Sequence, residues 1–215
     1  MTTVFLIRHG TTESNLKGLF QGSLDIPLND LGLAQAQCLA KRFRDTTIEA
    51  VYTSPLSRAR QTAECLCQLH SGLQPVVCEG LREICGGVLE GKTGTQNRLT
   101  YPEEIRCMKE CPAFFHPPGG ESTRLVYDRM RDTMQGIVAQ NPGRTIAVVS
   151  HGFTIQTYLG YVKRVPFPEI EPYIVGNASV TTLCYLEDGE IVLKQQSDES
   201  HLPPALQFYV ATNFL

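Results

Sequence analysis

Two continuous apolar runs, each ending in a histidine and a glycine, constrain the fold of this chain more than any other feature. The first, Val4-Phe5-Leu6-Ile7, leads into Arg8-His9-Gly10, and the second, Ile146-Ala147-Val148-Val149, leads into Ser150-His151-Gly152. Runs that are apolar throughout, rather than alternating, are typical of parallel strands covered by helices on both faces. Ligands of open α/β sheets bind beyond the carboxyl ends of the strands. We therefore expect both imidazoles at one edge of one sheet, beside a ligand.

A third strand end adds a second arginine to this edge. Residues 50–53 predict a strand, and Ser54-Pro55-Leu56-Ser57-Arg58 follows, with Arg58 near the start of the next helix. The guanidinium fork suits phosphate oxygens, and helix N-termini offer backbone N–H donors. A lone histidine or arginine is more often structural or solvated. Two histidines and two arginines that follow three strand ends together predict a site for a multiply charged anion.

The remaining pattern predicts an α/β fold, a three-layer α/β/α sandwich around a mostly parallel mixed sheet. Helices are expected over about 30–44, 58–70 and 122–140 and directly after Gly152, with Asn29 or Asp30 capping the first. A short strand is expected at 75–78. Asp188-Gly189, between apolar runs at 180–186 and 191–194, predicts an antiparallel hairpin at the sheet edge.

We interpret residues 1–215 as a single domain with an insertion at about 84–120. The periodic pattern weakens there, glycines mark loops, and only Pro102–Glu110 predicts a short helix. A chain of this length is sufficient for one sizeable core. The insertion is expected to lie over the strand ends as a lid or specificity element.

Charge and composition narrow the classes of partner. The formal net charge of −3 argues against nucleic acid as a partner. No stretch approaches the ~20 apolar residues that span a membrane, and the N-terminal run is too short for a secretory signal, so a soluble, cytoplasmic protein is expected. None of the eight cysteines forms a C-x-x-C pair, and most are expected to be small buried residues. The oligomeric state is not readable from the sequence.

Several ordered blocks resemble the signature of the histidine phosphatase superfamily, the phosphoglycerate mutase-like proteins. They are Arg8-His9-Gly10 with the following Thr11 to Asn15, Gln21-Gly22, Ser54 to Ala63, Leu81-Arg82-Glu83-Ile84, Glu90-Gly91, Gly119 to Ser122, and Ser150-His151-Gly152. Their order and spacing cover most of the chain. The resemblance implies the phosphoglycerate mutase-like form of the predicted fold and a phosphohistidine intermediate.

Phosphoryl transfer needs a nucleophile, positive charge around the phosphoryl oxygens and a proton for the leaving group. We predict His9 as the nucleophile, because an imidazole with a pKa near ~6.5 is available in its neutral form at cellular pH. Arg8, Arg58 and His151 are predicted to hold the phosphoryl oxygens. They supply the positive charge, so no metal and no other cofactor is expected.

The resemblance adds further residues to this predicted site. It implies that Asn15 contacts a phosphoryl oxygen and that Gln21, Gly22 and Gly152 line the substrate site. It also assigns Glu83 as the general acid that protonates the departing alcohol and then activates water. Glu90 could fill that role on chemistry alone, but its position matches a structural Glu-Gly of the family.

The predicted function is a metal-independent phosphomonoester phosphatase acting on a small phosphorylated metabolite. The Leu-Asn-Glu-Arg run of true phosphoglycerate mutases is absent. A cofactor-dependent phosphoglycerate mutase is the alternative, followed by a phospho-ligand-binding module without turnover. The chain has Gly86 and Leu89 where the family has aromatic residues, which is expected to remove bulk near Glu83. His201 could approach the pocket, although a surface role is equally expected.

Overall fold

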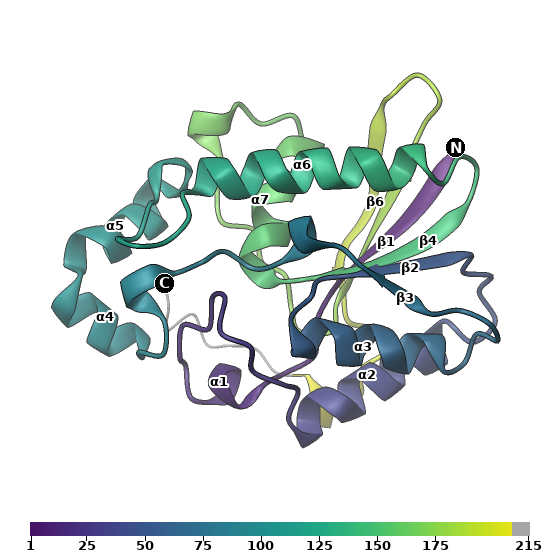
Figure 1. Ribbon diagram of the computed structural model, residues 1–215, viewed down its shortest axis with the longest axis horizontal. Coiled ribbons are helices and arrows are strands. Elements are labelled where there is room, and N and C mark those ends of the chain that lie inside the picture. The colour runs from purple at the N-terminus through teal and green to yellow at the C-terminus, as the bar shows by residue number, and fades with distance from the viewer. Residues whose placement is uncertain (208–215) are drawn as a thin grey trace.

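A six-stranded mixed sheet forms the centre of the computed structural model, which describes residues 1–207 (Figure 1). The spatial order is β3-β2-β4-β1-β5-β6. The first four are mutually parallel, whereas β5 runs antiparallel to β1, and β6 antiparallel to β5. The strands are β1 (Thr2–Arg8), β2 (Ala50–Thr53), β3 (Pro75–Val77), β4 (Thr145–Ser150), β5 (Val180–Tyr185) and β6 (Ile191–Asp198).

The two strands that end in His-Gly are neighbours in the sheet. In their parallel register Ile7 lies opposite Val149, and Arg8 opposite Ser150. The backbone N–H of His9 also donates to the carbonyl of Ser150 at 3.0 Å. His9 and His151 therefore leave the same sheet edge side by side, as the sequence predicted.

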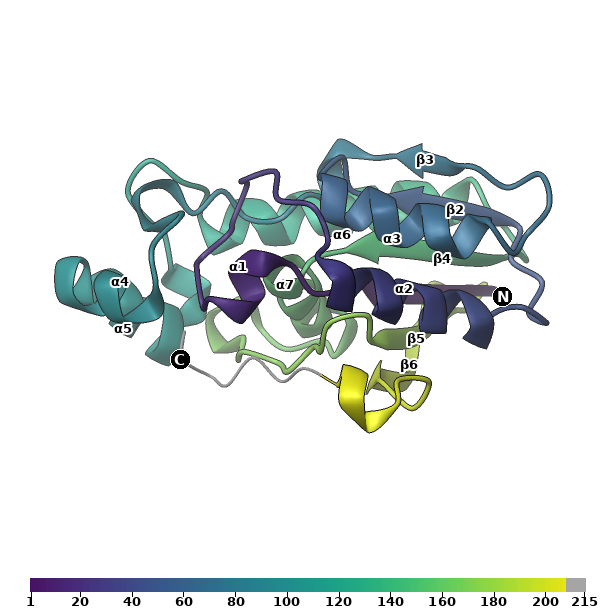
Figure 2. The same cartoon turned by 90° about the horizontal axis from the view of Figure 1, so that it is seen from below.

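Helices cover both faces of the sheet, which confirms the predicted three-layer fold. On one face lie α2 (Asp30–Arg42) and α3 (Ser57–Cys67), and on the other lie α6 (Thr123–Ala139) and α7 (Gly152–Val162) (Figure 1 and Figure 2). The side chain of Asn29 caps α2 by accepting from Gly32 N at 2.9 Å, and Ser122 caps α6 in the same way. Helix α3 ends three residues earlier than predicted, because residues 68–70 continue in a tighter turn.

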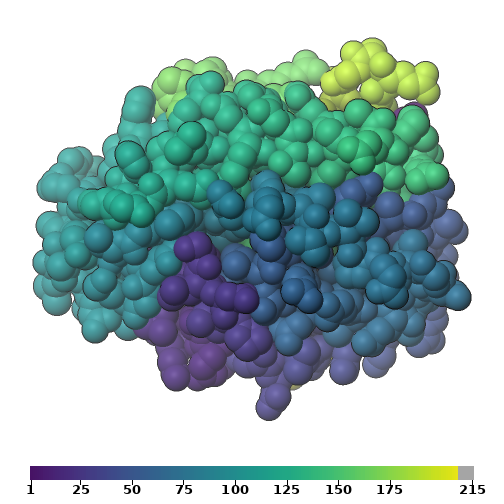
Figure 3. Space-filling model, viewed as in Figure 1, coloured from purple at the N-terminus to yellow at the C-terminus, as the bar shows by residue number. Residues whose placement is uncertain are grey.

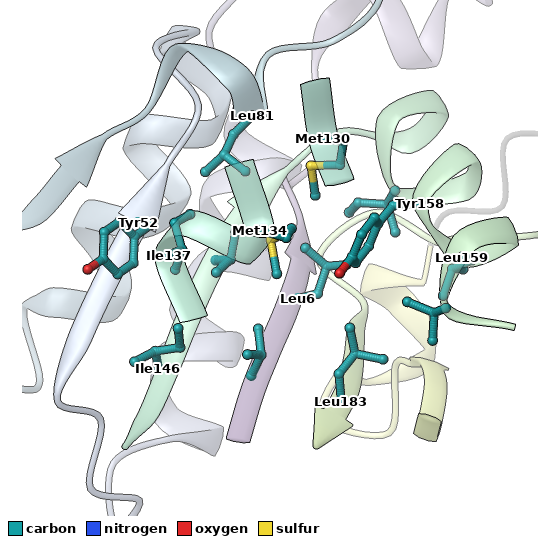
Figure 4. Close-up of a cluster of buried hydrophobic side chains, with 14 of the residues drawn as sticks. Leu6, Tyr52, Leu81, Met130, Met134, Ile137, Ile146, Tyr158, Leu159 and Leu183 are labelled. Carbon is teal, nitrogen blue, oxygen red and sulfur yellow. The ribbon is translucent and has the colours of Figure 1, made fainter. Parts of the chain in front are cut away.

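Alternate residues of β4 supply two separate cores. Ile146 and Val148 pack with α6 and α7 (Figure 4), whereas Ala147 and Val149 pack with α2 and α3. Complete burial of a valine, leucine, isoleucine or methionine side chain in such a core contributes about 1.5–3 kcal/mol to the free energy of unfolding. This two-sided burial is the physical reason why the strand is apolar throughout.

Residues 84–120 pack around a third hydrophobic cluster, away from the sheet. The predicted helix is present as α5 (Pro102–Glu110), and α4 (Gly94–Thr100) precedes it. Figure 2 shows both helices at one end of the molecule, beyond the carboxyl ends of β1 and β4. That the insertion at residues 84–120 acts as a lid remains a prediction. The remaining helical segments are α1 (Glu13–Leu16) and the 3₁₀ turns Glu79–Leu81, Gly87–Leu89, Pro112–Phe114, Phe167–Glu169 and Pro204–Leu206.

The structure contradicts two of the sequence expectations, one about the cysteines and one about the residues around Gly94. Only Cys67 and Cys184 are buried, and the other six cysteines, all of them free, are partly exposed because they lie on outer helix faces and in loops. The residues read as loop around Gly94 form α4, whose start is fixed by a capping box between Thr93 and Gln96.

Within residues 1–207, no helix combines the length and apolar character required to cross a bilayer.

Candidate active site

His9 and His151 face each other at the carboxyl ends of β1 and β4. Their ring centroids lie 5.0 Å apart. Both side chains are buried, with 2% of His9 and none of His151 exposed. The sequence prediction that two imidazoles meet at one sheet edge is therefore correct in geometry.

The His9 ring is held in one tautomer. Its Nδ1 lies 2.6 Å from the carbonyl oxygen of Gly10, and since a carbonyl only accepts, Nδ1 carries the proton. Nε2 then has a free lone pair. Burial, followed by the charges of Arg58 and Arg8, lowers the pKa of His9 well below 6.5, although the Gly10 carbonyl acts in the opposite direction. The imidazole is thus neutral at cellular pH and suited to nucleophilic attack.

His151 is positioned by a residue that the sequence analysis did not assign. Its Nε2 lies 2.6 Å from Ser54 Oγ, at the end of β2, and Ser54 Oγ accepts a hydrogen bond from Leu56 N. Burial, then the charge of Arg58 and the His9 ring, lowers the pKa of His151 well below 6.5. His151 is therefore also neutral, so the positive charge of the site comes from Arg8 and Arg58 and not from His151. The contact of His151 with a phosphoryl oxygen remains a prediction.

Two guanidinium groups flank the histidines, that of Arg58 buried and that of Arg8 half-buried. Arg8 Nη1 donates to Val175 O at 2.5 Å, and Arg58 donates to Leu24 O and Gly22 O at 2.7 and 2.8 Å. The Nε atoms of both arginines are buried without a partner among residues 1–207.

The charges of the two arginines are not neutralised by direct ion pairs. Burial lowers the pKa of both groups, that of Arg58 to about 10, so both are charged at neutral pH. No carboxylate of the described residues lies within ion-pair distance of either group. Buried charge without a close counterion is unfavourable, and an anionic ligand would relieve it.

Glu83 reaches the same cavity from the loop before residue 84. Its Oε1 accepts from Ile84 N and Thr154 N, both at 3.0 Å, and from Thr154 Oγ1 at 2.9 Å. Its Oε2 accepts from Phe153 N at 3.1 Å. The first turn of α7 thus fixes the carboxyl group in one orientation beside the anion site.

The loop after β1 supplies the amide groups of the predicted site. Asn15 Oδ1 accepts from Thr12 N and Thr12 Oγ1, both at 3.0 Å, which leaves Nδ2 as the group that Asn15 offers to a ligand. Gln21 Oε1 lies 2.8 Å from Thr12 Oγ1, so it shares the single proton of that hydroxyl with Asn15 Oδ1. Asn177, another residue that sequence reasoning missed, donates to the carbonyl of His9 at 3.2 Å.

Two glycines of the site are required by close packing. Gly22 has a φ of +52°, and a Cβ there would lie 2.1 Å from Glu90 Oε1. A Cβ on Gly152 would lie 3.2 Å from Arg8 Cζ. Glu90 itself holds loops together, because its Oε1 accepts from Ser23 N and Gly86 N, both at 2.7 Å. This contact agrees with the structural interpretation of Glu90.

Phe20 compensates in part for the expected loss of aromatic bulk near Glu83. Phe20 lies against Gly86 so closely that a Cβ on Gly86 would come within 2.3 Å of its ring. Phe20 also lines the cavity. An aromatic side chain from a different loop therefore occupies the space that Gly86 leaves open.

His201 lies away from the cavity. Its Nδ1 is 3.2 Å from Arg42 Nη1, and Arg42 pairs with Asp198 at 2.6 Å. Burial lowers the pKa of His201 to about 4. Its approach to the pocket is not observed, because the Arg42–Asp198 pair holds this segment on α2.

The predicted residues surround one cavity of about 270 Å³. Arg8, His9, Asn15, Gln21, Gly22, Arg58, Glu83 and Gly152 line it, while His151 does not line it but has its ring 5.0 Å from that of His9. The loop that carries Asn15 and Gln21 lies against the insertion on the face shown in Figure 3, and Phe20 N donates to Lys92 O at 2.9 Å. The structure thus gathers all the predicted site residues, and their roles remain predictions.

Comparisons with known proteins agree with this geometry. Probable phosphoglycerate mutase GpmB of Yersinia enterocolitica is 34% identical over 96% of this chain and 98% of its own. Metal-independent phosphoserine phosphatase of Arabidopsis thaliana is 30% identical over 94% of this chain and 84% of its own. The solved structure of Bacillus stearothermophilus YhfR superposes with a TM-score of 0.87 at 32% identity, covering 94% of this chain and 99% of that one. A model of the histidine phosphatase superfamily (branch 1) matches residues 4–198, and the chain therefore belongs to that superfamily.

Proposed function

We propose that the protein is a metal-independent phosphatase that hydrolyses phosphomonoesters of small metabolites through a phosphohistidine. One observation carries this proposal. His9, neutral and with Nε2 free, lies beside the guanidinium groups of Arg8 and Arg58, whose buried Nε atoms are unpartnered and which have no close carboxylate partner among residues 1–207. Such a site is built to bind a dianion next to a nucleophile.

The first chemical step transfers the phosphoryl group to the protein. His9 Nε2 attacks phosphorus, the bond between phosphorus and the alcohol oxygen breaks, and Glu83 in its acid form delivers a proton to that oxygen. Arg8 and Arg58 hold the non-bridging oxygens, with His151 and the amide of Asn15 as further hydrogen-bonding groups. Their positions are fixed before the substrate arrives, which is the condition for effective transition-state stabilisation.

The second step returns the enzyme to its starting state. Glu83, now a carboxylate, accepts a proton from a water molecule, whose oxygen attacks phosphorus. The bond between phosphorus and Nε2 breaks, and inorganic phosphate leaves. No metal takes part in either proposed step, because Arg8 and Arg58 supply the positive charge beside the phosphoryl group.

A phosphoglycerate mutase is the second candidate. The observation in its favour is the 34% identity to a protein named as a probable phosphoglycerate mutase. A mutase would protect the phosphohistidine from water and return the phosphoryl group to a bound acid. The two functions therefore differ in whether inorganic phosphate is released.

The test is phosphate release from a panel of phosphomonoesters in excess EDTA, with isomerisation of 3-phosphoglycerate followed in parallel. Wild type is compared with His9→Ala and with His116→Ala, which removes an exposed histidine outside the cavity. We expect release that persists in EDTA, disappears in His9→Ala and survives in His116→Ala. Full activity in folded His9→Ala would refute the nucleophile. Isomerisation without phosphate release would identify a mutase. Phosphate binding without either activity would identify a binding module.

A further inference from the structure

Two chemically different sets of side chains line the cavity. Arg8, His9, Asn15, Arg58 and Glu83 form the set described above, here called the charged end. The rest of the lining, here called the apolar end, is mainly aromatic and aliphatic, and its largest side chains are Phe20, Met108, Phe153, Tyr173 and Ile174. A phosphoryl group bound at the charged end would therefore direct its alcohol portion toward apolar side chains.

These apolar side chains come from three separate parts of the chain. Phe20 belongs to the loop after β1, Met108 to α5 of the insertion, and Tyr173 and Ile174 to the segment between α7 and β5. Ile174 is 72% exposed although it lies at the cavity, so apolar surface is left uncovered there. Exposed apolar surface beside a concave site is typical of ligand binding.

The apolar end also lacks positive charge. Among the described residues that line the cavity, the basic ones are Arg8 and Arg58, both at the charged end, whereas Glu171 adds an exposed carboxylate to the outer wall. Lys163 lies beside this end without lining the cavity, and its Nζ lies over the ring of Tyr173 at 4.1 Å. The sequence of residues 208–215 contains no lysine or arginine.

We propose that the preferred substrates are phosphomonoesters whose alcohol portion is uncharged and predominantly apolar, such as aryl-substituted alkyl phosphates. This inference rests on the proposed function of the charged end. A carboxylate on the alcohol portion would lose its water without gaining a cationic partner, and Glu171 would repel it. Phosphoserine and 3-phosphoglycerate, which both carry carboxylates, should therefore be poor substrates.

The first measurement is kcat/KM for 2-phenylethyl phosphate, O-phosphoserine and 3-phosphoglycerate. All three are alkyl esters, so differences in leaving-group basicity are small. Because a single methylene in an apolar pocket changes kcat/KM by about 10–200-fold, we expect at least about a 10-fold preference for the phenylethyl ester. Equal or higher kcat/KM for either carboxylate would overturn the proposal.

Binding of non-hydrolysable phosphonates separates this inference from the proposed function. 3-Phenylpropylphosphonate and 2-amino-4-phosphonobutyrate, the analogues of the phenylethyl and serine esters, are compared by calorimetry. Tighter binding of the phenyl compound supports the inferred substrate preference, whether or not any ester is hydrolysed. If no ester is hydrolysed, only the proposed phosphatase function is refuted. Equal or tighter binding of 2-amino-4-phosphonobutyrate overturns the inferred substrate preference.

Charge reversal at the outer wall tests the role of Glu171. Glu171→Lys should raise kcat/KM for 3-phosphoglycerate about threefold, and high salt should reduce the gain. Glu169→Lys is the matched control, because Glu169 is exposed, lies two residues away and does not line the cavity. No gain from Glu171→Lys, or the same gain from Glu169→Lys, would contradict the assigned role.

Truncation of the apolar wall gives an independent test. Met108→Ala should lower kcat/KM for 2-phenylethyl phosphate about 10-fold while changing that for methyl phosphate much less. Leu99→Ala is the matched control on the insertion, since Leu99 is 80% exposed and outside the cavity. An equal loss for both esters in Met108→Ala would mean that the side chain supports the fold rather than the alcohol portion.

Discussion

Lowering the pH from about 7 to about 5.5 should destabilise the folded protein through His9 and His151. The pKa of each is held well below 6.5, in both cases first by burial and then by the charge of Arg58. In this range the unfolded chain binds a proton at each histidine while the folded protein does not. The free energy of unfolding therefore falls as the pH falls through 6.5.

The size of the effect follows from proton linkage. A histidine that stays neutral in the folded state reduces the free energy of unfolding by about 1.4 kcal/mol for each pH unit below its unfolded pKa. Between about pH 7 and about pH 5.5 this amounts to roughly 1.3 kcal/mol for each histidine, and to about 2.5 kcal/mol for the pair. His201, whose pKa is lowered to about 4, acts in the same direction.

Glu199 is the carboxyl group that opposes the histidines, because burial raises its pKa and the folded protein takes up that proton before the unfolded chain does as the pH falls. The other shifted carboxyl groups titrate below this window. The pKa values of Glu121 and Asp198 are lowered, even though burial opposes the shift, by hydrogen bonds and by the charges of Arg129 and Arg42 respectively. Their contribution is lost only as the pH falls below about 5, because unfolded carboxyl groups titrate near 4. The pH range above that value therefore reports mainly on histidines.

The assay is urea unfolding in phosphate-free buffers at the two pH values. Wild type should lose about 2.5 kcal/mol on acidification. The loss in His151→Gln should be about 1.3 kcal/mol smaller than the loss in wild type. His116→Gln, which removes an exposed imidazole, is the matched substitution. Equal stability of the wild type at both pH values would refute the reasoning, as would an equal reduction in the pH effect by both variants.

Three further changes test the packing of the site. Arg58→Lys should lower kcat/KM by about 10²–10³-fold in steady-state assays, because an ammonium group does not reproduce the guanidinium fork that bonds two carbonyls. Gly22→Ala should reduce the free energy of unfolding by about 1–3 kcal/mol in urea titrations, since its Cβ would meet Glu90; unchanged stability would disprove the clash. Asn177→Ala should reduce it by about 1 kcal/mol, because the hydrogen bond to the carbonyl of His9 is lost, and a stability equal to wild type would show that this bond contributes nothing.

The sheet and the charged end of the cavity were predictable because their signals are local. Val4 to Ile7 and Ile146 to Val149 are apolar on both faces since two layers of helices cover them. A strand that ends in a histidine places that histidine at the carboxyl edge whatever the rest of the chain does. The sequence therefore indicated the meeting of His9 and His151 without any knowledge of distant contacts.

The insertion and the apolar end were not predictable in the same way. Helix α4 was missed because the glycines at 91 and 94 favour a loop, although the capping box of Thr93 and Gln96 was a usable signal. Phe20 replaces the aromatic bulk missing at Gly86, and this compensation connects two loops that are 66 residues apart in the sequence. Asn177 and Ser54 acquire their contacts only through the tertiary fold, so no local pattern marks them.

The two ends of the cavity also differ in what family similarity says about them. The charged end is built from the blocks that define the superfamily, and it interacts with the phosphoryl group that all phosphomonoesters share. The apolar end is built from Phe20, Met108 and the segment that carries Tyr173 and Ile174, none of which belongs to those blocks. Because the two ends bind different parts of the substrate, the alcohol portion can change without any change in the phosphoryl site. We therefore expect the names of relatives to inform the reaction of this chain, and its own apolar wall to select among the esters.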